Sequence, residues 1–360
     1  MLRFPTHRGA QIMEIARRET LAAMAASLAA MVPVRANALL NDADAIDLSF
    51  VNPELRPAVA TIRASFGGNT HLTVDGIEQL RGASPAEIDP PFAHIPVVRR
   101  SIPGLAGNPP VTIYVVNARP GRKRGGILYM HGGGYVLGRA IEDIGTCQAL
   151  AEALDSTVVS VDYRLAPAAR YTASIEDNYT ALRWVYQNAG DIGMDPRRIA
   201  VMGESAGGGH AALLAITARD RREVPVAFQC LVYPMLDDRT GSTRPVPPPI
   251  GSLVWTAEVN RFGWRSLLGR EPGHPTLTAG VPAREAILAG LPPAWVGVGS
   301  IDLFVQEDMA YAERLIAAAV PTELVVVPGA YHAFQYFAPD APLAKCFRAS
   351  MLAALQAALV

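Results

Sequence analysis

Residues 199–209 read IAVMGESAGGG and place Ser205 between glycines in a Gly-x-Ser-x-Gly spacing. The apolar run 199–202 predicts a buried strand, and residues 206–220 have the composition of a helix. A strand–turn–helix with a serine at its turn is the setting of a nucleophile elbow. Only small neighbours let the chain pass closely through such a turn, and the N-terminus of the following helix favours negative charge. We therefore predict that Ser205 is a nucleophile, in preference to a glycine turn that only packs a helix on a strand.

The alternation of apolar strands and helices continues on both sides of this turn. Further strands are predicted for the short apolar runs at 111–116, 126–130, 158–161, 228–233, 294–298 and 324–327. Helix-like stretches lie between or after them, at 141–154, 173–188, 302–319 and 343–359. Apolar strands that alternate with helices indicate an α/β fold whose parallel sheet is covered on both faces.

Two segments interrupt the alternation. Residues 39–95 have the pattern of helices and loops without strands, and residues 237–290 are rich in Pro, Gly and Trp. The second segment is longer than an ordinary connection needs. We interpret both as parts of a cap over one edge of the sheet. The expected organisation is an N-terminal cap segment at 39–95 and a catalytic domain at 96–360, with a cap insertion at about 237–290.

A second glycine-rich turn, His131-Gly132-Gly133-Gly134, directly follows the expected strand at 126–130. Glycines leave their N–H groups unscreened, and such fixed donors stabilise the oxyanion of an acyl transfer by about 2.7–4 kcal/mol each. The N–H of Ala206, next to the serine, would be a further donor. No GK[ST] sequence follows, which excludes a phosphate-binding P-loop. We expect His131 to orient this turn rather than to act as a base.

A serine nucleophile at such an elbow needs an acid and then a histidine further along the chain. Only His274 and His332 lie well beyond Ser205. His274 lies in the Pro-rich insertion, whereas His332 lies in a loop just after the last strong apolar run, so His332 is the predicted base. Asp302 follows the expected strand at 294–298 and is the predicted acid.

Other acidic residues compete for this role. Glu307 and Asp308 lie one to two turns into the expected helix, and we expect them to face solvent. Asp162 and Arg164, in the stretch 162–167, are interpreted as buried structural partners rather than catalytic residues.

Composition excludes several classes of protein. Half of the 360 residues are apolar and 18% are charged, which excludes a disordered chain. The net charge of −1 gives no basic excess, so nucleic acid is not an expected partner. Cys147, Cys230 and Cys346 lie far apart, which excludes a disulfide scaffold and argues against a zinc site. We expect three buried thiols.

Residues 1–38 have the parts of a twin-arginine signal peptide. Arg17-Arg18 precede an uncharged, Ala-rich run at 20–34, and Ala36-Asn37-Ala38 supplies a cleavage pattern. The run is too short to cross a bilayer of about 30 Å, so no integral membrane span is expected. The sequence thus predicts a periplasmic or secreted protein. The alternative is a cytoplasmic protein in which this segment is an amphipathic helix packed on the domain.

Taken together, these motifs resemble the hormone-sensitive-lipase-like branch of the α/β-hydrolases, the bacterial family IV esterases. The resemblance covers about residues 90–360 and rests on HGGG at 131–134, DYRLAP at 162–167, GESAGG at 203–208, Tyr233-Pro234, Asp302 and His332. It implies an α/β-hydrolase fold with a mostly parallel central sheet of about eight strands, flanked by helices, and a helical cap. It also implies a carboxylesterase that prefers short acyl chains. Glu204 departs from the family pattern, which more often has Asp there.

The mechanism that the resemblance implies uses a Ser-His-Asp triad. Ser205 attacks the ester carbonyl, His332 transfers the proton, and Asp302 orients and stabilises the imidazolium. The oxyanion hole would consist of N–H groups of the glycine turn and Ala206, with Gly133 and Gly134 as donors and Gly132 shaping the loop. No metal or organic cofactor is needed, and the expected partner is a small-molecule ester.

The sequence indicates less about substrate specificity. Candidate pocket walls are the aromatic residues near the two motifs and in the insertion, although ordinary core packing explains each equally well: Tyr135, Trp255, Phe262, Trp264 and Phe334. A cap favours short- to medium-chain esters over triglycerides. Amide, lactone or carbamate hydrolysis and a non-catalytic receptor on the same fold stay open as alternatives. The sequence does not decide the oligomeric state, and a homodimer is compatible with it.

Overall fold

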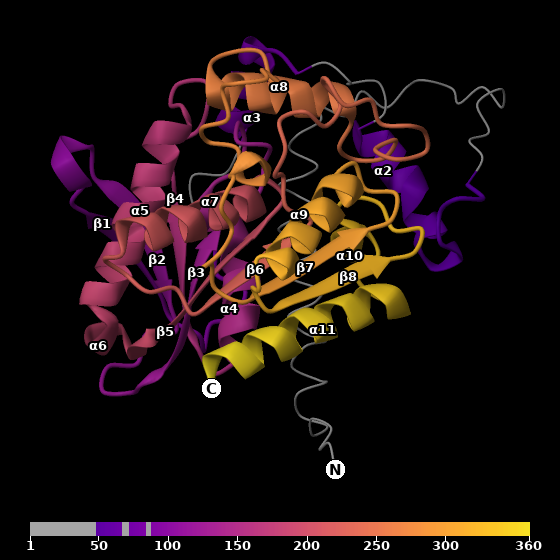
Figure 1. Ribbon diagram of the computed structural model, residues 1–360. Helices are drawn as coiled ribbons and strands as arrows, with labels where there is room; N and C mark the ends of the chain where they lie inside the picture. The colour runs from indigo at the N-terminus through magenta and orange to yellow at the C-terminus, as the bar shows by residue number, and fades with distance from the viewer. Residues whose placement is uncertain (1–47, 67–71, 84–87) are drawn as a thin grey trace.

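The fold is a single mixed sheet covered by helices (Figure 1). The computed structural model describes residues 48–66, 72–83 and 88–360, so the expected leader at 1–38 lies outside the described residues. Within them, eight strands have the order β1-β2-β4-β3-β5-β6-β7-β8. The expected α/β-hydrolase fold with a mostly parallel sheet is confirmed.

Only the first two strands break the parallel arrangement. β1 (Val97–Ile102) pairs antiparallel with β2 (Val111–Val116), and β2 pairs antiparallel with β4 (Thr157–Asp162). All other neighbours are parallel, and these strands are β3 (Arg124–Met130), β5 (Met194–Glu204), β6 (Phe228–Val232), β7 (Ala294–Gly299) and β8 (Thr322–Val327). The carboxyl ends of β5, β7 and β8 therefore meet at one edge of the sheet.

The sequence pattern did not predict β1. Its sequence VVRRSI has no apolar run, and four of its six residues are exposed. A strand at the edge of a sheet is held by backbone hydrogen bonds to one neighbour, and charged side chains such as Arg99 and Arg100 protect such an edge from pairing with another chain. The strand is defined by this pairing rather than by apolar periodicity.

Helices cover both faces of the sheet. α4 (Ile144–Ala153) and α11 (Pro342–Leu359) pack on one face, and α5 (Tyr171–Gln187), α7 (Ala206–Arg221) and α9 (Val305–Ala317) pack on the other. Shorter helices are η2 (Pro53–Ala58), η3 (Leu105–Gly107), η4 (Ala140–Asp143), α6 (Ala189–Ile192), η5 (Pro282–Arg284) and α10 (Phe334–Phe337). No helix in the described part of the chain combines the length and apolarity needed to cross a membrane.

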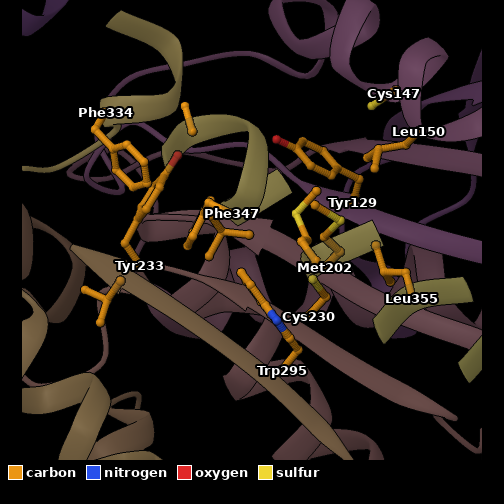
Figure 2. Close-up of a cluster of buried hydrophobic side chains, with 14 of the residues drawn as sticks. Tyr129, Cys147, Leu150, Met202, Cys230, Tyr233, Trp295, Phe334, Phe347 and Leu355 are labelled. Carbon is orange, nitrogen blue, oxygen red and sulfur yellow. The ribbon is translucent and has the colours of Figure 1, made fainter. Parts of the chain in front are cut away.

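Each central strand contributes to two cores because successive side chains point to opposite faces. In β5, Ala200 and Met202 join the core under α4 and α11, which Figure 2 shows, whereas Ile199 and Val201 join the core under α5, α7 and α9. Burial on both faces explains why these strands are continuous apolar runs.

A third apolar cluster connects two helices above the sheet to the loop after β3. α2 (Val59–Phe66) and α3 (Val74–Ala83) precede the sheet, and α8 (Ala257–Leu268) lies in the insertion after β6 (Figure 1). Ile77 of α3 packs with Trp264 of α8 and with Val136 of the loop after β3. This cluster places helices from both interrupting segments over the carboxyl end of β3.

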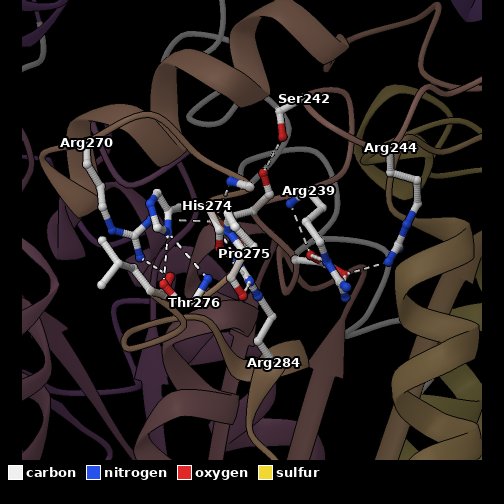
Figure 3. Close-up of polar contacts among 12 residues, drawn as sticks. Arg239, Ser242, Arg244, Arg270, His274, Pro275, Thr276 and Arg284 are labelled. Atoms are coloured by element: carbon white, nitrogen blue, oxygen red, sulfur yellow. Dashed lines mark hydrogen bonds and ion pairs between the residues drawn. The ribbon is translucent and has the colours of Figure 1, made fainter.

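The segment after β6 is held by buried ion pairs, shown in Figure 3. The carboxylate of Asp238 is fully buried and accepts hydrogen bonds from the Arg284 guanidinium at 3.1 Å and from the Gly273 N–H at 2.7 Å. Arg270 lies 3.7 Å from the same carboxylate. Removing one partner of such a buried pair costs about 3–5 kcal/mol, so this cluster holds distant parts of the insertion together.

The expectation of three buried thiols is wrong for one of them. Cys147 and Cys230 are buried in the core of Figure 2, but Cys346 is exposed. α11 covers the sheet with one face only, and its buried side is formed by residues such as Phe347 and Met351. Cys346 lies on the opposite, solvent-facing side.

Candidate active site

Ser205 lies at the sharp turn between β5 and α7. Its backbone has φ 55° and ψ −121°, a conformation that L side chains rarely adopt. The flanking glycines permit the turn: a Cβ on Gly203 would lie 2.2 Å from the Gly207 carbonyl oxygen, and a Cβ on Gly207 would lie 2.1 Å from the carbonyl oxygen of Met130. Larger residues at either position would force the helix away from the sheet.

The structure brings Ser205, His332 and Asp302 together. His332 Nε2 lies 3.1 Å from Ser205 Oγ, and His332 Nδ1 lies 2.8 Å from Asp302 Oδ2. The second carboxylate oxygen of Asp302 accepts a hydrogen bond from the Phe304 N–H at 3.0 Å. The imidazole can therefore take a proton from the hydroxyl while the carboxylate fixes its orientation.

This chain of hydrogen bonds is shielded from water. The exposed fractions of Ser205, His332 and Asp302 are 7%, 5% and 1%. The rings of Tyr233 and Phe304 meet the imidazole edge-on, with centroids 4.7 and 5.3 Å from it. In this low-dielectric setting, charge–charge interactions are stronger than in water.

The glycine turn after β3 lies against the serine. A Cβ on Gly132 would be 3.7 Å from the Ser205 Cβ, and Gly133 and Gly134 have φ values of 114° and 60°. Neither the N–H of Gly133 nor that of Gly134 is bonded to another described residue. Ala206 begins α7, where the first N–H groups have no partner within the helix. Gly133 and Gly134 line one cavity with Ser205, and Ala206 directly follows the serine in the chain.

His131 is built into the base of this turn. It is 2% exposed, its ring stacks on Tyr163 at 4.2 Å, and its Nδ1 lies 2.7 Å from the Gly132 carbonyl oxygen. The Tyr163 hydroxyl donates to the His131 carbonyl at 2.7 Å. Burial lowers the pKa of His131. The residue orients the glycine turn and does not contact the serine hydroxyl.

The expectation that Glu307 and Asp308 face solvent is wrong. Both side chains are buried in α9, at 1% and 0% exposure. Glu307 accepts hydrogen bonds from the N–H groups of Leu236 and Asp237 at 2.6 and 3.1 Å, which fixes the chain after β6. The first turn of α9 turns inward under the insertion, so position along the helix was a poor guide to exposure.

The remaining polar candidates lie outside the triad, and Asp162 and Arg164 are half-buried rather than buried as expected. His274 is exposed and bonds locally to Thr276. Arg164 makes a bidentate pair with Asp177, with contacts of 2.8 and 3.1 Å from its Nε, and Asp162 accepts from the Ala140 N–H at 3.0 Å. Among the described residues, no group of three His, Cys, Asp or Glu side chains could hold a metal ion.

A cavity of about 160 Å³ opens in front of the serine. Of the five aromatic residues expected as its walls, Trp255 lines it. The Trp255 ring covers Gly134, and its Nε1 donates to the Asn260 side chain at 3.1 Å, which fixes the ring's orientation. The indole therefore forms a rigid wall beside the glycine turn.

The other four aromatic residues are not part of this wall. Tyr135 and Trp264 are buried against each other, and Phe262 packs on the same apolar cluster. Phe334 is buried against Phe347 of α11. The left-handed conformation of Tyr135 (φ 68°) turns its side chain under the glycine loop, where its hydroxyl donates to the Met235 carbonyl. The prediction that these four residues line the pocket rests on proximity in sequence, which does not determine the direction of a side chain.

Most of the polar residues that line the cavity were not predicted from the sequence. Asp143, Tyr233 and Tyr336 line it together with Glu204, the residue that departs from the family pattern. Burial raises the pKa of Asp143 and of Glu204. A larger cleft of about 580 Å³ adjoins it and shares residues 138, 139 and 142. The Tyr233-Pro234 pair and the unusual Glu204 were the signals that could have identified part of this lining.

Comparisons with known proteins agree with this geometry. A family model described as alpha/beta hydrolase fold matches residues 127–336. The chain is 36% identical over 275 residues to the esterase LipI of Mycobacterium tuberculosis, which covers 75% of this chain and 85% of the relative. It is 39% identical over 241 residues to the carboxylesterase NlhH of the same species, covering 65% and 73%.

Two solved structures extend the similarity to the whole fold. The esterase LipW from Mycobacterium marinum has a TM-score of 0.73 at 33% identity, covering 87% of this chain and 97% of that one. A bacterial heroin esterase has a TM-score of 0.74 at 32% identity, covering 88% and 100%.

Proposed function

The chain belongs to the α/β-hydrolase family, in its hormone-sensitive-lipase-like esterase branch, and we propose that it is a serine carboxylesterase for short- to medium-chain esters. The observation that carries the proposal is the bridge that His332 makes between Ser205 Oγ and Asp302, at 3.1 and 2.8 Å. A receptor that only binds ligands on this fold would not need this bridge.

Acylation begins when the Ser205 hydroxyl attacks the ester carbonyl. His332 Nε2 takes the hydroxyl proton as the new O–C bond forms, and Asp302 stabilises the imidazolium through Nδ1. The N–H groups of Gly133, Gly134 and Ala206 stabilise the oxyanion of the tetrahedral intermediate. His332 then returns the proton to the leaving alcohol, which departs and leaves an acyl-serine ester.

Deacylation repeats these steps with water as the nucleophile. His332 takes a proton from water, hydroxide attacks the acyl carbonyl, and the collapse of the intermediate releases the carboxylic acid and regenerates Ser205. Apart from the water consumed in deacylation, these steps use the protein's own side chains and backbone N–H groups.

The size of the cavity supports a preference for short acyl chains. Pockets for drug-sized ligands measure about 300–1,000 Å³. The cavity in front of Ser205 measures about 160 Å³ and is closed on one side by the fixed ring of Trp255. This space suits a butyryl or hexanoyl group, whereas a dodecanoyl group would have to extend into the adjoining cleft.

The proposal is tested with a series of p-nitrophenyl esters from C2 to C12. We expect kcat/KM to be higher for C4 and C6 than for C12. Ser205→Ala and Asp302→Asn should each lower kcat by about 10⁴–10⁶ without a proportionate change in KM. Asp308→Asn is the matched control, because this carboxyl lies in the helix that follows Asp302 and is not hydrogen-bonded to His332.

Two outcomes would contradict the proposal. Faster hydrolysis of the matching p-nitroanilide than of the ester would assign the site to amide chemistry. Binding of the esters without turnover by the unmodified protein would assign it to a receptor.

A further inference from the structure

The carboxylate of Glu204 connects the nucleophile elbow to the loop that carries the base. Glu204 is the last residue of β5, directly before Ser205, and is 8% exposed. Its Oε2 accepts a hydrogen bond from the Tyr233 hydroxyl at 2.7 Å, and its Oε1 accepts one from the Tyr336 hydroxyl. We propose that Glu204 is a positioning residue that holds His332 in line with Ser205 and stabilises its protonated form. This inference rests on the proposed function.

The contacts of Glu204 join the nucleophile's strand to the segment that follows the base. Tyr336 lies on α10, four residues after His332, so its bond to Glu204 ties the base loop to the strand end that carries the nucleophile. The adjacent residue, Gln335, donates from its side-chain amide to the Tyr233 hydroxyl. Tyr233 thus links Glu204 to α10 a second time while its ring meets the imidazole edge-on at 4.7 Å.

These two links act on the same short segment. α10 has only four residues, and Phe334 anchors it from below by packing on Phe347 (Figure 2). Asp302 fixes the imidazole through Nδ1, and its other carboxylate oxygen is bonded to the Phe304 N–H rather than to α10. The distance between Ser205 and His332 therefore depends on a connection from β5 to α10, and Glu204 supplies it.

The carboxylate of Glu204 also acts on the base through its charge. Burial raises the pKa of Glu204, whereas the Tyr336 and Tyr233 hydroxyls, the charge of His332 and the Tyr129 hydroxyl lower it. The other carboxyl of this group, Asp143, has its pKa raised well above the usual range by burial and by the charge of Glu204. Glu204 accepts hydrogen bonds from two tyrosine hydroxyls, and such bonds favour the charged form of a carboxyl. Because the attraction is mutual, that charge favours the imidazolium that forms during acylation.

Glu204→Gln tests this role because it keeps the size of the side chain and removes the charge. We expect kcat/KM for p-nitrophenyl butyrate to fall about 10- to 100-fold at pH 8, by analogy with groups that orient the ligands of a metal site. The fall should be in kcat, with KM unchanged. The acidic limb of the kcat/KM profile should move to lower pH, because the variant removes a buried negative charge near the imidazolium that forms during acylation.

Two further variants separate charge from connection. Glu204→Asp keeps the charge and should restore the position of the acidic limb while kcat stays below that of the unmodified enzyme. Tyr336→Phe removes one link and should lower kcat several-fold. Tyr179→Phe is its matched control, because Tyr179 lies on α5, away from the site, and its hydroxyl donates to Glu223 at 3.0 Å. It should leave kcat unchanged.

The outcomes that would overturn the proposal are specific. An acidic limb that stays in place in Glu204→Gln, with equal losses of kcat in Glu204→Gln and Glu204→Asp, would reduce Glu204 to a packing residue. If Glu204→Gln does not fold by circular dichroism, a Tyr336→Phe variant with unchanged kcat overturns the positioning role. Loss of the proposed function itself would appear differently, as ester hydrolysis that survives in Ser205→Ala.

Discussion

Three buried carboxyl groups near the start of α9 have different roles. Asp302 is paired with His332, and Glu307 accepts two backbone N–H groups. Asp308 has no hydrogen-bond partner among the described residues. Burial, together with the charges of Glu307 and Asp302, raises the pKa of Asp308 well above its usual range. An unpaired buried carboxylate is destabilising, so Asp308 favours its neutral form in the folded protein.

The first prediction is that Asp308→Asn stabilises the protein in a pH-dependent way. In the unfolded chain, Asp ionises at about pH 3.9, whereas Asp308 in the folded protein ionises only at a higher pH. Between the two pKa values the unfolded state is favoured, by about 1.4 kcal/mol for each pH unit. The Asn side chain does not ionise, so the variant lacks this pH-dependent loss of stability. The variant's advantage in free energy of unfolding should therefore grow from pH 4 to the folded-state pKa of Asp308 and then level off.

Urea denaturation at pH 5 and pH 8 measures this difference. Glu223→Gln is a suitable control, since Glu223 is largely exposed and its substitution should change stability little at either pH. An advantage of Asp308→Asn that is equal at both pH values would mean that Asp308 is ionised in the folded protein.

At the scale of elements, close backbone approach between β3, β5 and α7 determines the shape of the site. Gly207 of α7 sits against the end of β3, where a Cβ would lie 2.1 Å from the Met130 carbonyl oxygen and 2.5 Å from that of His131. The same approach sets the glycine turn beside Ser205. The nucleophile and the oxyanion donors are therefore positioned by one packing contact.

The second prediction compares two glycines in helices. Gly207→Ala should lower the free energy of unfolding by about 1–3 kcal/mol or more, because the new methyl group meets rigid backbone atoms. It should also lower kcat, since the displaced helix carries the Ala206 N–H away from the glycine turn. Gly190→Ala in α6 meets nothing within 4 Å and should be neutral or stabilising by about 0.4–1 kcal/mol.

Thermal denaturation and kcat with p-nitrophenyl butyrate provide both readouts. If Gly207→Ala were as stable and active as the unmodified enzyme, α7 would have to shift freely against β3, and the packing argument for the oxyanion site would fail.

At the scale of the whole molecule, the parallel sheet assembles a site from residues far apart in the chain. Ser205, Asp302 and His332 follow β5, β7 and β8, whose carboxyl ends lie at the same edge. Helices from two separate segments, α3 and α8, pack together above the neighbouring strand β3. Both the catalytic geometry and the size of the cavity are thus properties of the assembled fold.

The third prediction concerns export, which we propose from the twin-arginine pattern of residues 1–38. A leader contributes nothing to the fold, whereas a helix packed on the domain would expose apolar surface when removed. We expect residues 39–360 to be as stable and active as the full chain. Full-length protein expressed in a bacterium with a twin-arginine pathway should reach the periplasm with a new N-terminus after Ala38.

N-terminal sequencing of the periplasmic fraction and a melting curve of the truncated protein distinguish a cleaved leader from a helix packed on the domain. Arg17→Lys together with Arg18→Lys is the control for the export route and should retain the protein in the cytoplasm. An uncut cytoplasmic full chain combined with a destabilised truncated form would support the packed-helix alternative instead.

The sequence by itself determined the features that depend on local chemistry. Strands buried on both faces are apolar runs, and the tight turns at Ser205 and after β3 require glycine. Both features could therefore be predicted from the sequence. Motif order was enough to select Asp302 and His332, the two residues that the structure brings to Ser205.

Only the tertiary structure decided the features that depend on packing between distant elements. β1 exists because its backbone pairs with β2, not because of its own composition. Glu307 and Asp308 are buried because the insertion after β6 covers the start of α9. Trp255 lines the cavity while Trp264, nine residues later, fills a core, because each side chain's direction is set by the neighbours that it meets after folding.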